Sequence, residues 1–396
     1  MDVEVARWLV SADAEAAIQR GCEFADPGSL RSGTALRREL SPDRAAAVLD
    51  LVALRRQGRT KLGERADKLF FTHDGLQQAT RWPVACWRAE QIVSLGFTAV
   101  VDLGCGLGID ALACQDAGLT VTAVESDPVT AQLAQANLNT TQGAGQSTII
   151  TADATTLDLT QWLDDRTAIF IDPARRTSRG RSWDVGDLSP SWEFVHSVLT
   201  GAQGLVVVKL GPGFPRQLLP EDCDVTWVSQ RGDLVETTLW AWAGASGGRT
   251  AVVLGQTGEV RLNAGTPCPA PGPLSTHLFE PDPAVIRSRA IGELATQLGA
   301  WPVLADIAYL TGPVAVPTAL ATPFTIENTM DYSVRALRAW VREHHIGTLE
   351  IKVRGLDIDP AVLRRQLRLS GREQATLVLT PTIDGTKVLV VRRLAV

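Results

Sequence analysis

Apolar runs alternate with amphipathic stretches along the middle of the chain. From Thr98 onward, each largely apolar run is followed by a stretch with the apolar spacing of a helix, such as 109–117 and 128–139. The expected strands are 98–103, 120–125, 147–153, 168–172 and 204–210. Strands that alternate with helices predict a parallel, doubly wound α/β sheet, and the nearly continuous apolar runs predict burial on both faces.

The pattern changes after this series. Two apolar segments, 224–229 and 234–242, flank a polar turn and predict a hairpin at the edge of the sheet. The small residues of 243–249 predict a break, and 251–262 then has the pattern of a second hairpin. The proline-rich stretch 266–273 predicts a connector.

The two ends of the chain have other patterns. Val3–Gln19 and Pro42–Arg56 have helical apolar spacing, and Ser41 has the position of an N-cap. Asp282-Pro283 predicts the start of a helix that reaches about Leu298. The last part predicts a helix (331–345), a strand (349–354), a helix (360–369), and two strands (375–381 and 386–393) joined by the turn Asp384-Gly385.

These patterns predict four regions. They are a helical N-terminal segment (1–83), a Rossmann-like α/β domain (84–245), a hairpin and connector region (246–324), and a small C-terminal α+β domain (325–396). A chain of 396 residues is long enough for two or three domains.

A glycine-rich loop follows the first expected strand, in V-V-D-L-G-C-G-L-G-I-D. Gly104, Gly106 and Gly108 permit a sharp turn and a close approach of a ligand to the backbone. Ile109 stands where a dinucleotide-binding fingerprint has its third glycine, and Asp102 precedes the loop. These two features favour S-adenosylmethionine over a nicotinamide or flavin cofactor, because an acid near the loop suits its sulfonium and amino group.

Two further acids follow the second and third expected strands. Glu125 lies about 20 residues beyond the loop, where a carboxylate can accept hydrogen bonds from ribose hydroxyls, and Asp153-Ala154 is placed to meet the adenine. Either acid alone is more often a helix cap or a solvated loop residue. In order and at this spacing, the three acids predict a cofactor crevice.

Asp102 to Gly108, Glu125, Asp153 and Asp172-Pro173 resemble the successive motifs of class I S-adenosylmethionine-dependent methyltransferases. The stretches F-F-T-H-D-G-L-Q-Q-A-T and L-E-I-K-V-R-G resemble a bacterial subgroup with a C-terminal THUMP-like domain. The resemblance implies a methyltransferase, and the THUMP name implies RNA binding by analogy. In the subgroup, the first stretch (with Phe71, Thr72, Gln78 and Thr80 here) sits near the site.

The fourth expected strand ends in Asp172-Pro173-Ala174-Arg175. We expect Asp172, Pro173 and Arg175 to form the catalytic edge of the crevice, because a strand-end acid there is hard to explain structurally. The motif lacks the aromatic residue that follows the proline in many amine-methylating enzymes. A cysteine nucleophile is also doubtful, because acids surround Cys223 and disfavour its thiolate.

A cationic cluster follows this motif. Arg176, Arg179 and, from the fifth strand, Lys209 are candidates to bind the substrate, with Arg181 nearby. The alternative is a solvated loop whose cations offset nearby acids. Trp183 and Trp192 could stack on a base, although tryptophans are more often packed beneath a loop.

Charge is distributed unevenly. The chain has a net charge of −6, whereas residues 331–396 hold twelve Lys/Arg and seven Asp/Glu, a net of +5. A basic tail on an acidic body can dock onto phosphates, and together with its resemblance to a THUMP-like domain this favours RNA as the partner. A small-molecule or protein methyltransferase with the tail as a structural cap stays open, as does a non-catalytic RNA-binding module. Neither the methylated atom nor the oligomeric state follows from the sequence.

The remaining features indicate a cytoplasmic protein. The six cysteines are scattered, without a C-x-x-C pair or metal-ligand spacing, so we expect reduced thiols and no metal. We expect no signal peptide and no membrane span, because no stretch of about 18 apolar residues occurs.

Overall fold

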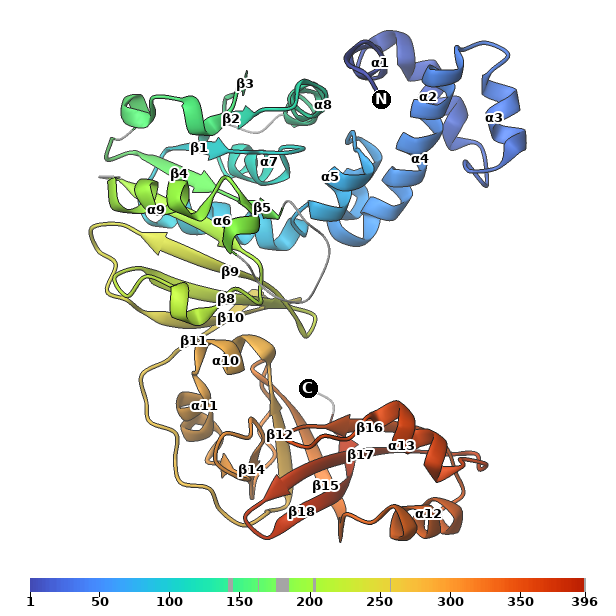
Figure 1. Ribbon diagram of the computed structural model, residues 1–396, viewed down its shortest axis with the longest axis vertical. Coiled ribbons are helices and arrows are strands. Elements are labelled where there is room, and N and C mark those ends of the chain that lie inside the picture. The colour runs from blue at the N-terminus through green and yellow to red at the C-terminus, as the bar shows by residue number, and fades with distance from the viewer. Residues whose placement is uncertain (142–144, 163, 176–184, 202–203, 257, 395–396) are drawn as a thin grey trace. The chain divides into compact units, whose positions relative to one another are not determined.

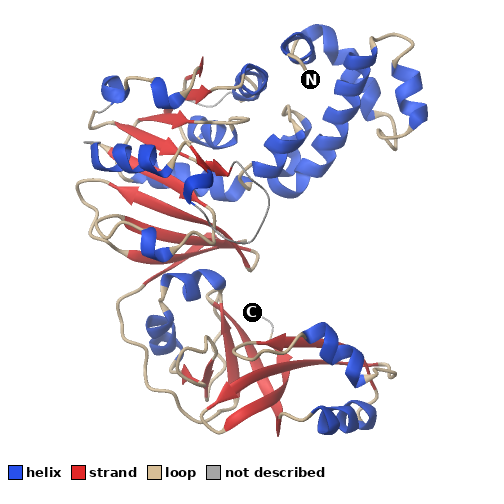
Figure 2. Ribbon diagram, in the orientation of Figure 1, coloured by secondary structure: helices blue, strands red, loops and turns tan. Residues whose placement is uncertain are grey.

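The computed structural model describes residues 1–141, 145–162, 164–175, 185–201, 204–256 and 258–394. The N-terminal 98 residues form helices and no strand (Figure 2). Its α-helices are α1 (Val3–Leu9), α2 (Glu15–Cys22), α3 (Leu30–Leu36), α4 (Pro42–Leu62), α5 (His73–Gln78) and α6 (Trp82–Ser94). Ser41 caps α4 as predicted, since its hydroxyl accepts from the Arg44 N–H at 3.4 Å and Pro42 occupies the first turn.

A nine-stranded sheet follows, in the order β11-β10-β8-β9-β7-β4-β1-β2-β3 (Figure 1). Its strands are β1 (Ala99–Leu103), β2 (Thr120–Glu125), β3 (Ser147–Thr151), β4 (Thr167–Ile171), β7 (Leu205–Leu210), β8 (Asp224–Gln230), β9 (Asp233–Ala241), β10 (Arg249–Gly255) and β11 (Gly258–Asn263). β1, β2, β3, β4 and β7 pair in parallel, and β9 is antiparallel to β7. The predicted parallel α/β sheet is confirmed.

One prediction about this sheet is wrong. The hairpin of β8 and β9 does not form its edge, because β10 pairs in parallel with β8 and β11 pairs antiparallel with β10. The buried run Ala251–Leu254 explains the extension, since a lone hairpin could not cover these apolar residues. The glycine-rich break at 243–249 therefore leads back into the sheet.

The helices between the strands cover the sheet. α7 (Ile109–Asp116) packs on β1 and β2, α8 (Pro128–Leu138) packs on β2 and β3, and α9 (Trp192–Gly201) packs on β7. Asp127 caps α8, since its carboxylate accepts from the Thr130 N–H at 2.8 Å and Pro128 occupies the first turn. This arrangement fixes where each parallel strand ends and where the next helix begins.

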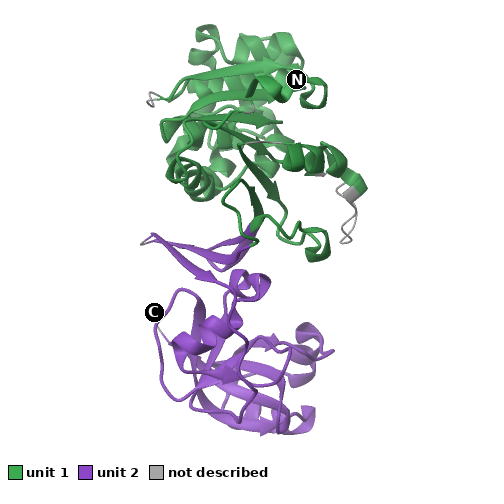
Figure 3. Ribbon diagram, turned by 90° about the vertical axis from the view of Figure 1, so that its left-hand side faces the viewer, with its two compact units in different colours: residues 1–224, 237–247 green, residues 225–236, 248–396 purple. Residues whose placement is uncertain are grey.

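The chain divides into two compact units, residues 1–224 with 237–247 and residues 225–236 with 248–396 (Figure 3). The second unit contains a seven-stranded sheet in the order β13-β14-β12-β15-β18-β17-β16. Its strands are β12 (His277–Pro281), β13 (Trp301–Pro302), β14 (Leu310–Gly312), β15 (Ala321–Asp331), β16 (Ile346–Val353), β17 (Glu373–Thr382) and β18 (Gly385–Arg393). Strands from 277–331 thus share a sheet with the C-terminal strands.

Two helices cover the C-terminal part of this sheet. α12 (Val334–Glu343) and α13 (Pro360–Leu367) bury Leu337, Val341, Leu363 and Leu367 in one apolar core with β16, β17 and β18. The predicted order of helix, strand, helix, strand, strand is confirmed. The predicted helix 283–298 is instead two helices, α10 (Pro283–Ser288) and α11 (Ile291–Leu298), because Arg289 adopts a left-handed φ of 65° that ends the first.

Candidate active site

The carboxyl ends of four parallel strands meet at one edge of the large sheet. Leu103 pairs with both Val124 and Ile171, and Ile171 pairs with Val208. The residues that come next in the four strands are therefore neighbours at this edge: Gly104, Glu125, Asp172 and Lys209. Ligands of open α/β sheets bind at this kind of edge.

The glycine loop has a backbone that other residues rarely adopt. Gly104, Gly106 and Gly108 have φ values of 91°, 55° and 74°. A side chain added at Gly104 or Gly106 would meet no atom within 4 Å, so crowding does not require glycine at these positions. Glycine is required because other residues are strained at a positive φ. The open space beside these two backbone positions leaves room for a ligand to approach the main chain.

Asp102 lies beneath this loop in an unusual state. Its side chain belongs to β1 and the residue is 1% exposed, yet neither carboxylate oxygen has a hydrogen-bond partner in the described part of the chain. Burial, followed by the nearby charges of Asp110 and Asp172, raises the pKa of Asp102 well above its usual range. A buried carboxylate without partners is costly, so this position suits a ligand that brings donors or positive charge.

Glu125 is tied to the loop. Its carboxylate accepts from the Gly106 N–H at 3.0 Å and from the Asp127 N–H at 2.8 Å. Because an ionised carboxylate can accept about four hydrogen bonds, capacity remains for a ligand. The side chain therefore links the end of β2 to the backbone of the glycine loop.

Asp153 serves as a helix cap in this structure. Its carboxylate accepts from the Thr155 N–H at 2.9 Å and from the Thr155 hydroxyl at 2.7 Å, and these bonds lower the pKa of Asp153. Ala154 is buried directly after it, at the start of a short 3-10 helix, Ala154–Thr156. Both residues follow β3, next to β2 in the sheet.

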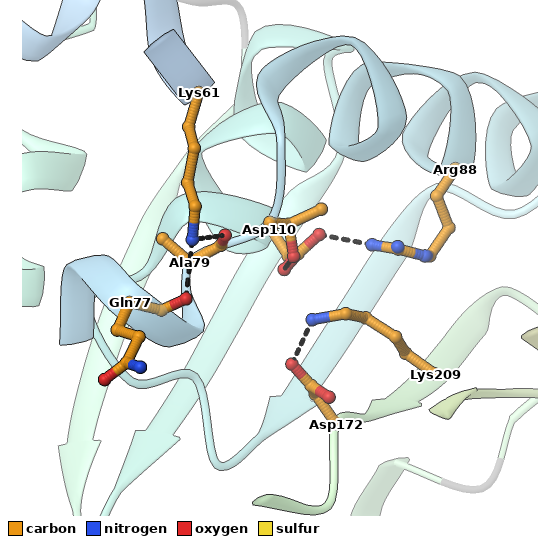
Figure 4. A network of polar contacts seen from close by, with 8 residues as sticks. Lys61, Gln77, Ala79, Arg88, Asp110, Asp172 and Lys209 are labelled. Atoms are coloured by element: carbon orange, nitrogen blue, oxygen red, sulfur yellow. Dashed lines mark hydrogen bonds and ion pairs between the residues drawn. The ribbon is translucent and has the colours of Figure 1, made fainter. Parts of the chain in front are cut away.

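A polar network that sequence reasoning did not find lies beside the loop (Figure 4). Arg88 of α6 forms an ion pair with Asp110 in the first turn of α7, and the Thr80 hydroxyl donates to the same carboxylate at 2.6 Å. Burial would raise the pKa of Asp110, but the charges of Arg88 and Lys209 and the bond from Thr80 outweigh it and lower the pKa. A lone arginine in the apolar pattern of α6, 3% exposed, was the available signal.

The segment before α6 is fastened to α4. The Lys61 ammonium donates to the carbonyls of Leu76, Gln77 and Ala79, at 2.9, 2.5 and 3.2 Å, which holds the end of α5 (Figure 4). Burial first, and then the charge of Lys209, lowers the pKa of Lys61. Lys61 satisfies carbonyls that a helix end otherwise leaves without partners.

A second fastening comes from α8. The side-chain amide of fully buried Asn137 donates to the carbonyls of Phe70 and Leu107, at 3.1 and 2.9 Å, and accepts from the Phe70 N–H at 2.7 Å. Gly75 of α5 packs so closely on Leu107 that a methyl group there would lie 2.6 Å from that side chain. Of the residues that the resemblance placed near the site, Phe71 and Thr80 are buried, whereas Gln78 is exposed.

The motif after β4 is described only in part. Asp172 forms an ion pair with Lys209 of β7, and Ala174–Arg175 (β5) pairs with Leu188–Ser189 (β6) just after Pro173. Trp192 packs on Phe214 at 5.0 Å between ring centroids, and Cys223 is buried. The other candidates after the motif lie outside the described residues: Arg176, Arg179, Arg181 and Trp183.

Known proteins with similar sequences decide the family. Two Mycobacterium tuberculosis proteins, from strains CDC 1551 and H37Rv, are known as uncharacterized S-adenosylmethionine-dependent methyltransferases. Each is 30% identical to this chain over 348 residues, which cover 85% of this chain and 93% of the relative. The chain belongs to the S-adenosylmethionine-dependent methyltransferases. Residues 321–393 of this methyltransferase also match the THUMP domain-like family.

A solved structure shares the fold of the methyltransferase. A crystal structure from Porphyromonas gingivalis W83, assigned as a methyltransferase, matches it with a TM-score of 0.74 and 20% identity, over 100% of this chain and 98% of that one. The enzyme uses S-adenosylmethionine, and the site fits this cofactor, because Asp102 lacks partners and the glycine backbone faces open space.

Two further findings concern membranes and metal ions. In the described part of the methyltransferase, no helix is both long and apolar enough to cross a bilayer. Across the same residues, no group of three or more His, Cys, Asp or Glu is arranged to hold a metal ion.

Proposed function

We propose that this methyltransferase transfers the methyl group of S-adenosylmethionine to RNA. In this proposal Asp102 faces the positive end of the cofactor, and Gly104, Gly106 and Gly108 let it approach the backbone. Glu125 accepts from the ribose hydroxyls, and Asp153-Ala154 meets the adenine. The unpartnered carboxylate of Asp102 supports this assignment most strongly.

The acceptor side of the proposed site begins where β4 and β7 end. Asp172, Pro173 and Arg175 would border the transferred methyl group, and Arg176, Arg179 and Lys209 would contact the substrate. The charged methyl donor is already activated, so holding the acceptor in line with it supplies much of the rate enhancement.

The observation that carries the RNA assignment is an arginine surface in the C-terminal part. It consists of seven exposed arginines of α12, α13 and the turn after α13: Arg335, Arg338, Arg342, Arg364, Arg365, Arg368 and Arg372. Among the described residues, none of the seven has a carboxylate oxygen within 4.0 Å. Arginines without acidic partners are available for phosphates, which they bind in a bidentate manner.

The spacing on α12 strengthens this assignment. Arg335, Arg338 and Arg342 recur at three- and four-residue intervals and share one face of the helix, beside the stripe of the buried Leu337 and Val341. α13 packs against α12 and adds its own arginines. The match of residues 321–393 to the THUMP domain-like family supports the same expectation, because that name implies RNA binding by analogy.

RNA binding by the full chain tests the proposal. The triple variant Arg335→Gln/Arg342→Gln/Arg365→Gln removes three cations that donate no hydrogen bond to the backbone in the described part of the chain, unlike Arg338 and Arg364. We expect weaker binding of total bacterial RNA, and a slope of log affinity against log salt that is smaller by about 2 to 3. The matched control is Arg31→Gln/Arg37→Gln/Arg38→Gln, which removes the same charge from exposed positions of the N-terminal segment.

The two variants separate RNA recognition from general electrostatics. We expect the control variant to bind RNA with nearly the affinity of the wild type. Equal losses in both variants, or no RNA binding by the wild type at low salt, would contradict the arginine surface as the binding site.

A further inference from the structure

An ammonium group lies beside the acid at the acceptor side of the crevice. The Lys209 ammonium is paired with the Asp172 carboxylate, and their side chains are 13% and 33% exposed (Figure 4). The two residues come from adjacent parallel strands, in which Ile171 pairs with Val208. The sheet register therefore fixes the pair next to Gly104 of the loop.

Lys209 is surrounded by the charges of the site. Its charge acts on the carboxylates of Asp102 and Asp110 as well as on Asp172, and it acts on the ammonium of Lys61. The carboxylates gather on three elements, β1, α7 and the end of β4, whereas Lys209 comes from β7. A largely buried cation thus lies among these acids at the edge of the sheet where, in the proposed function, the donor methyl and the acceptor meet.

This pair restricts the chemistry of the acceptor. An exocyclic base amine offers two N–H donors, which the Asp172 carboxylate can still accept. The Lys209 ammonium, however, is a donor with no lone pair, and the nitrogen of such an amine is a poor acceptor because its lone pair is delocalised into the ring. A hydroxyl group offers both functions: its oxygen accepts from the ammonium, and its proton can be donated to the carboxylate. Lys209 and Asp172 together match a hydroxyl better than an amine.

We propose that the methyl acceptor is a hydroxyl oxygen, which in RNA is the ribose 2′-hydroxyl, held between Lys209 and Asp172. This inference rests on the proposed function, in which RNA is the substrate. A ribose acceptor also requires no aromatic residue to stack on a flipped base, and the motif Asp172-Pro173-Ala174-Arg175 contains none.

The proposed step balances in atoms and charge. A lone pair of the hydroxyl oxygen forms the new O–CH₃ bond, while the electron pair of the breaking S–CH₃ bond stays on sulfur and neutralises it. The O–H proton passes to the Asp172 carboxylate, and the Lys209 ammonium stabilises the negative charge that develops on the oxygen.

Alkaline hydrolysis of the labelled product tests the acceptor directly. The wild-type enzyme is incubated with S-[methyl-³H]adenosylmethionine and total bacterial RNA, and the RNA is hydrolysed with alkali. A 2′-O-methyl group blocks cleavage of the adjacent phosphodiester bond, because the 2′-oxygen can no longer attack it. If the acceptor is the ribose 2′-hydroxyl, we expect label in alkali-resistant dinucleotides.

The other outcomes contradict different statements. Label in mononucleotides would mean that a base is methylated, which overturns the hydroxyl acceptor and leaves RNA as the substrate. No label in RNA would overturn the RNA proposal and the ribose assignment with it.

Variants of Lys209 test its role in methyl transfer, because a purely structural role would not lower the rate while cofactor affinity is kept. We expect Lys209→Met to bind S-adenosylmethionine within about threefold of the wild type by calorimetry, while methyl transfer falls at least about 100-fold. Lys209→Arg, which keeps the charge, should retain more activity than Lys209→Met. The matched control is Lys387→Met, which removes another ammonium paired with a carboxylate, that of Asp331 at 2.6 Å. Wild-type transfer by Lys209→Met would overturn the role of Lys209.

Discussion

Cations are used in two different ways in the cofactor crevice and in the arginine surface. In the crevice, Lys209 is paired with Asp172, Arg88 with Asp110, and Lys61 with three backbone carbonyls. On the arginine surface, seven exposed arginines have no carboxylate within 4.0 Å among the described residues. The first arrangement holds the segments around the glycine loop in place, whereas the second leaves its charge available to a large polyanion.

The difference predicts different responses to mutation and to salt. Paired, buried ions hold backbone segments in place, and their loss is felt as a loss of stability. Exposed arginines without a carboxylate or backbone partner in the described chain, namely Arg335, Arg342 and Arg365, contribute little to folding, and their loss is felt in a salt-dependent binding reaction. Variants that break the crevice pairs should therefore change the free energy of unfolding, while variants of Arg335, Arg342 and Arg365 should leave it nearly unchanged.

The largest effect is expected from Arg88→Leu. This change leaves Asp110, whose side chain is 12% exposed, without its cationic partner between α6 and the start of α7. Loss of one member of a buried pair costs about 3–5 kcal/mol, because the other charge stays buried. Urea unfolding at pH 7 measures the change.

Arg20→Leu is the matched control for that experiment. Arg20 forms an ion pair with Glu39 in the N-terminal segment, but the two side chains are 49% and 57% exposed. Exposed pairs contribute about 0–1 kcal/mol. If both variants lose the same stability, the buried pair does not hold the crevice together.

A second effect should have opposite signs for stability and for binding. Without cofactor, Asp102→Asn removes a buried charge that has no partners in the described part of the chain, and should raise stability at pH 8 by about 1–3 kcal/mol. Affinity for S-adenosylmethionine should fall about 10-fold or more, because a hydrogen bond to a charged group is lost. Calorimetry and urea unfolding measure the two quantities.

The pH dependence of that variant follows from the raised pKa of Asp102. Because the folded-state pKa of Asp102 lies above its unfolded-state value, the wild type is more stable at low pH, where Asp102 is protonated. It loses this stability as the pH rises through the folded-state pKa of Asp102. The stability gained by Asp102→Asn should therefore be large at pH 8 and should shrink as the pH falls below that pKa. A gain that is constant from pH 5 to pH 8 would contradict the burial of an ionisable Asp102.

A smaller effect is expected from Gly75→Ala. The added methyl group would lie 2.6 Å from the Leu107 side chain, so α5 or the glycine loop must shift. Overpacking of this kind costs about 1–3 kcal/mol, and we expect weaker cofactor binding because Leu107 belongs to the loop. Gly33→Ala in α3 is the control, because no atom lies within 4 Å of the added methyl group, and it should stabilise the protein slightly. Equal affinity for S-adenosylmethionine in the two variants would contradict the expectation that α5 positions the glycine loop.

The smallest effect is expected from Asp153→Ala, which removes an exposed cap. Loss of its bonds to Thr155 should cost less than about 1 kcal/mol. The pKa of Asp153 is lowered in the folded state, so this stability is present above the unfolded-state pKa and is lost as pH falls through the folded-state value. Asp153 and Asp102 should thus show opposite pH trends in urea unfolding, and a shared trend would contradict their different environments.

Much of the fold could be predicted because its signals are local. Runs such as Leu205–Leu210 indicate buried strands, and Gly104, Gly106 and Gly108 mark a loop whose φ values only glycine adopts readily. The break at 243–249 was also visible, but the return of β10 into the sheet was not, because strand pairing depends on contacts between distant segments.

The sequence predicted only those parts of the candidate site in which an acidic residue stands at or near the end of a recognisable strand. Asp102 and Asp172 were visible as strand-end acids in the sequence. Arg88 and Asp110 are 22 residues apart, and Asn137 and Phe70 are 67 apart, so nothing in their local pattern joins them. A charged or amide residue within an otherwise apolar helix face was the signal available for Arg88 and Asn137.

Methyl transfer to RNA is the measurement that tests the central claim most directly. The purified enzyme is incubated with S-[methyl-³H]adenosylmethionine and total bacterial RNA, and the product is divided and treated with or without RNase. We predict RNase-sensitive label that decreases with added salt and with Arg335→Gln/Arg342→Gln/Arg365→Gln, but not with the control triple variant. Cofactor binding together with label confined to protein or small molecules would contradict RNA as the acceptor.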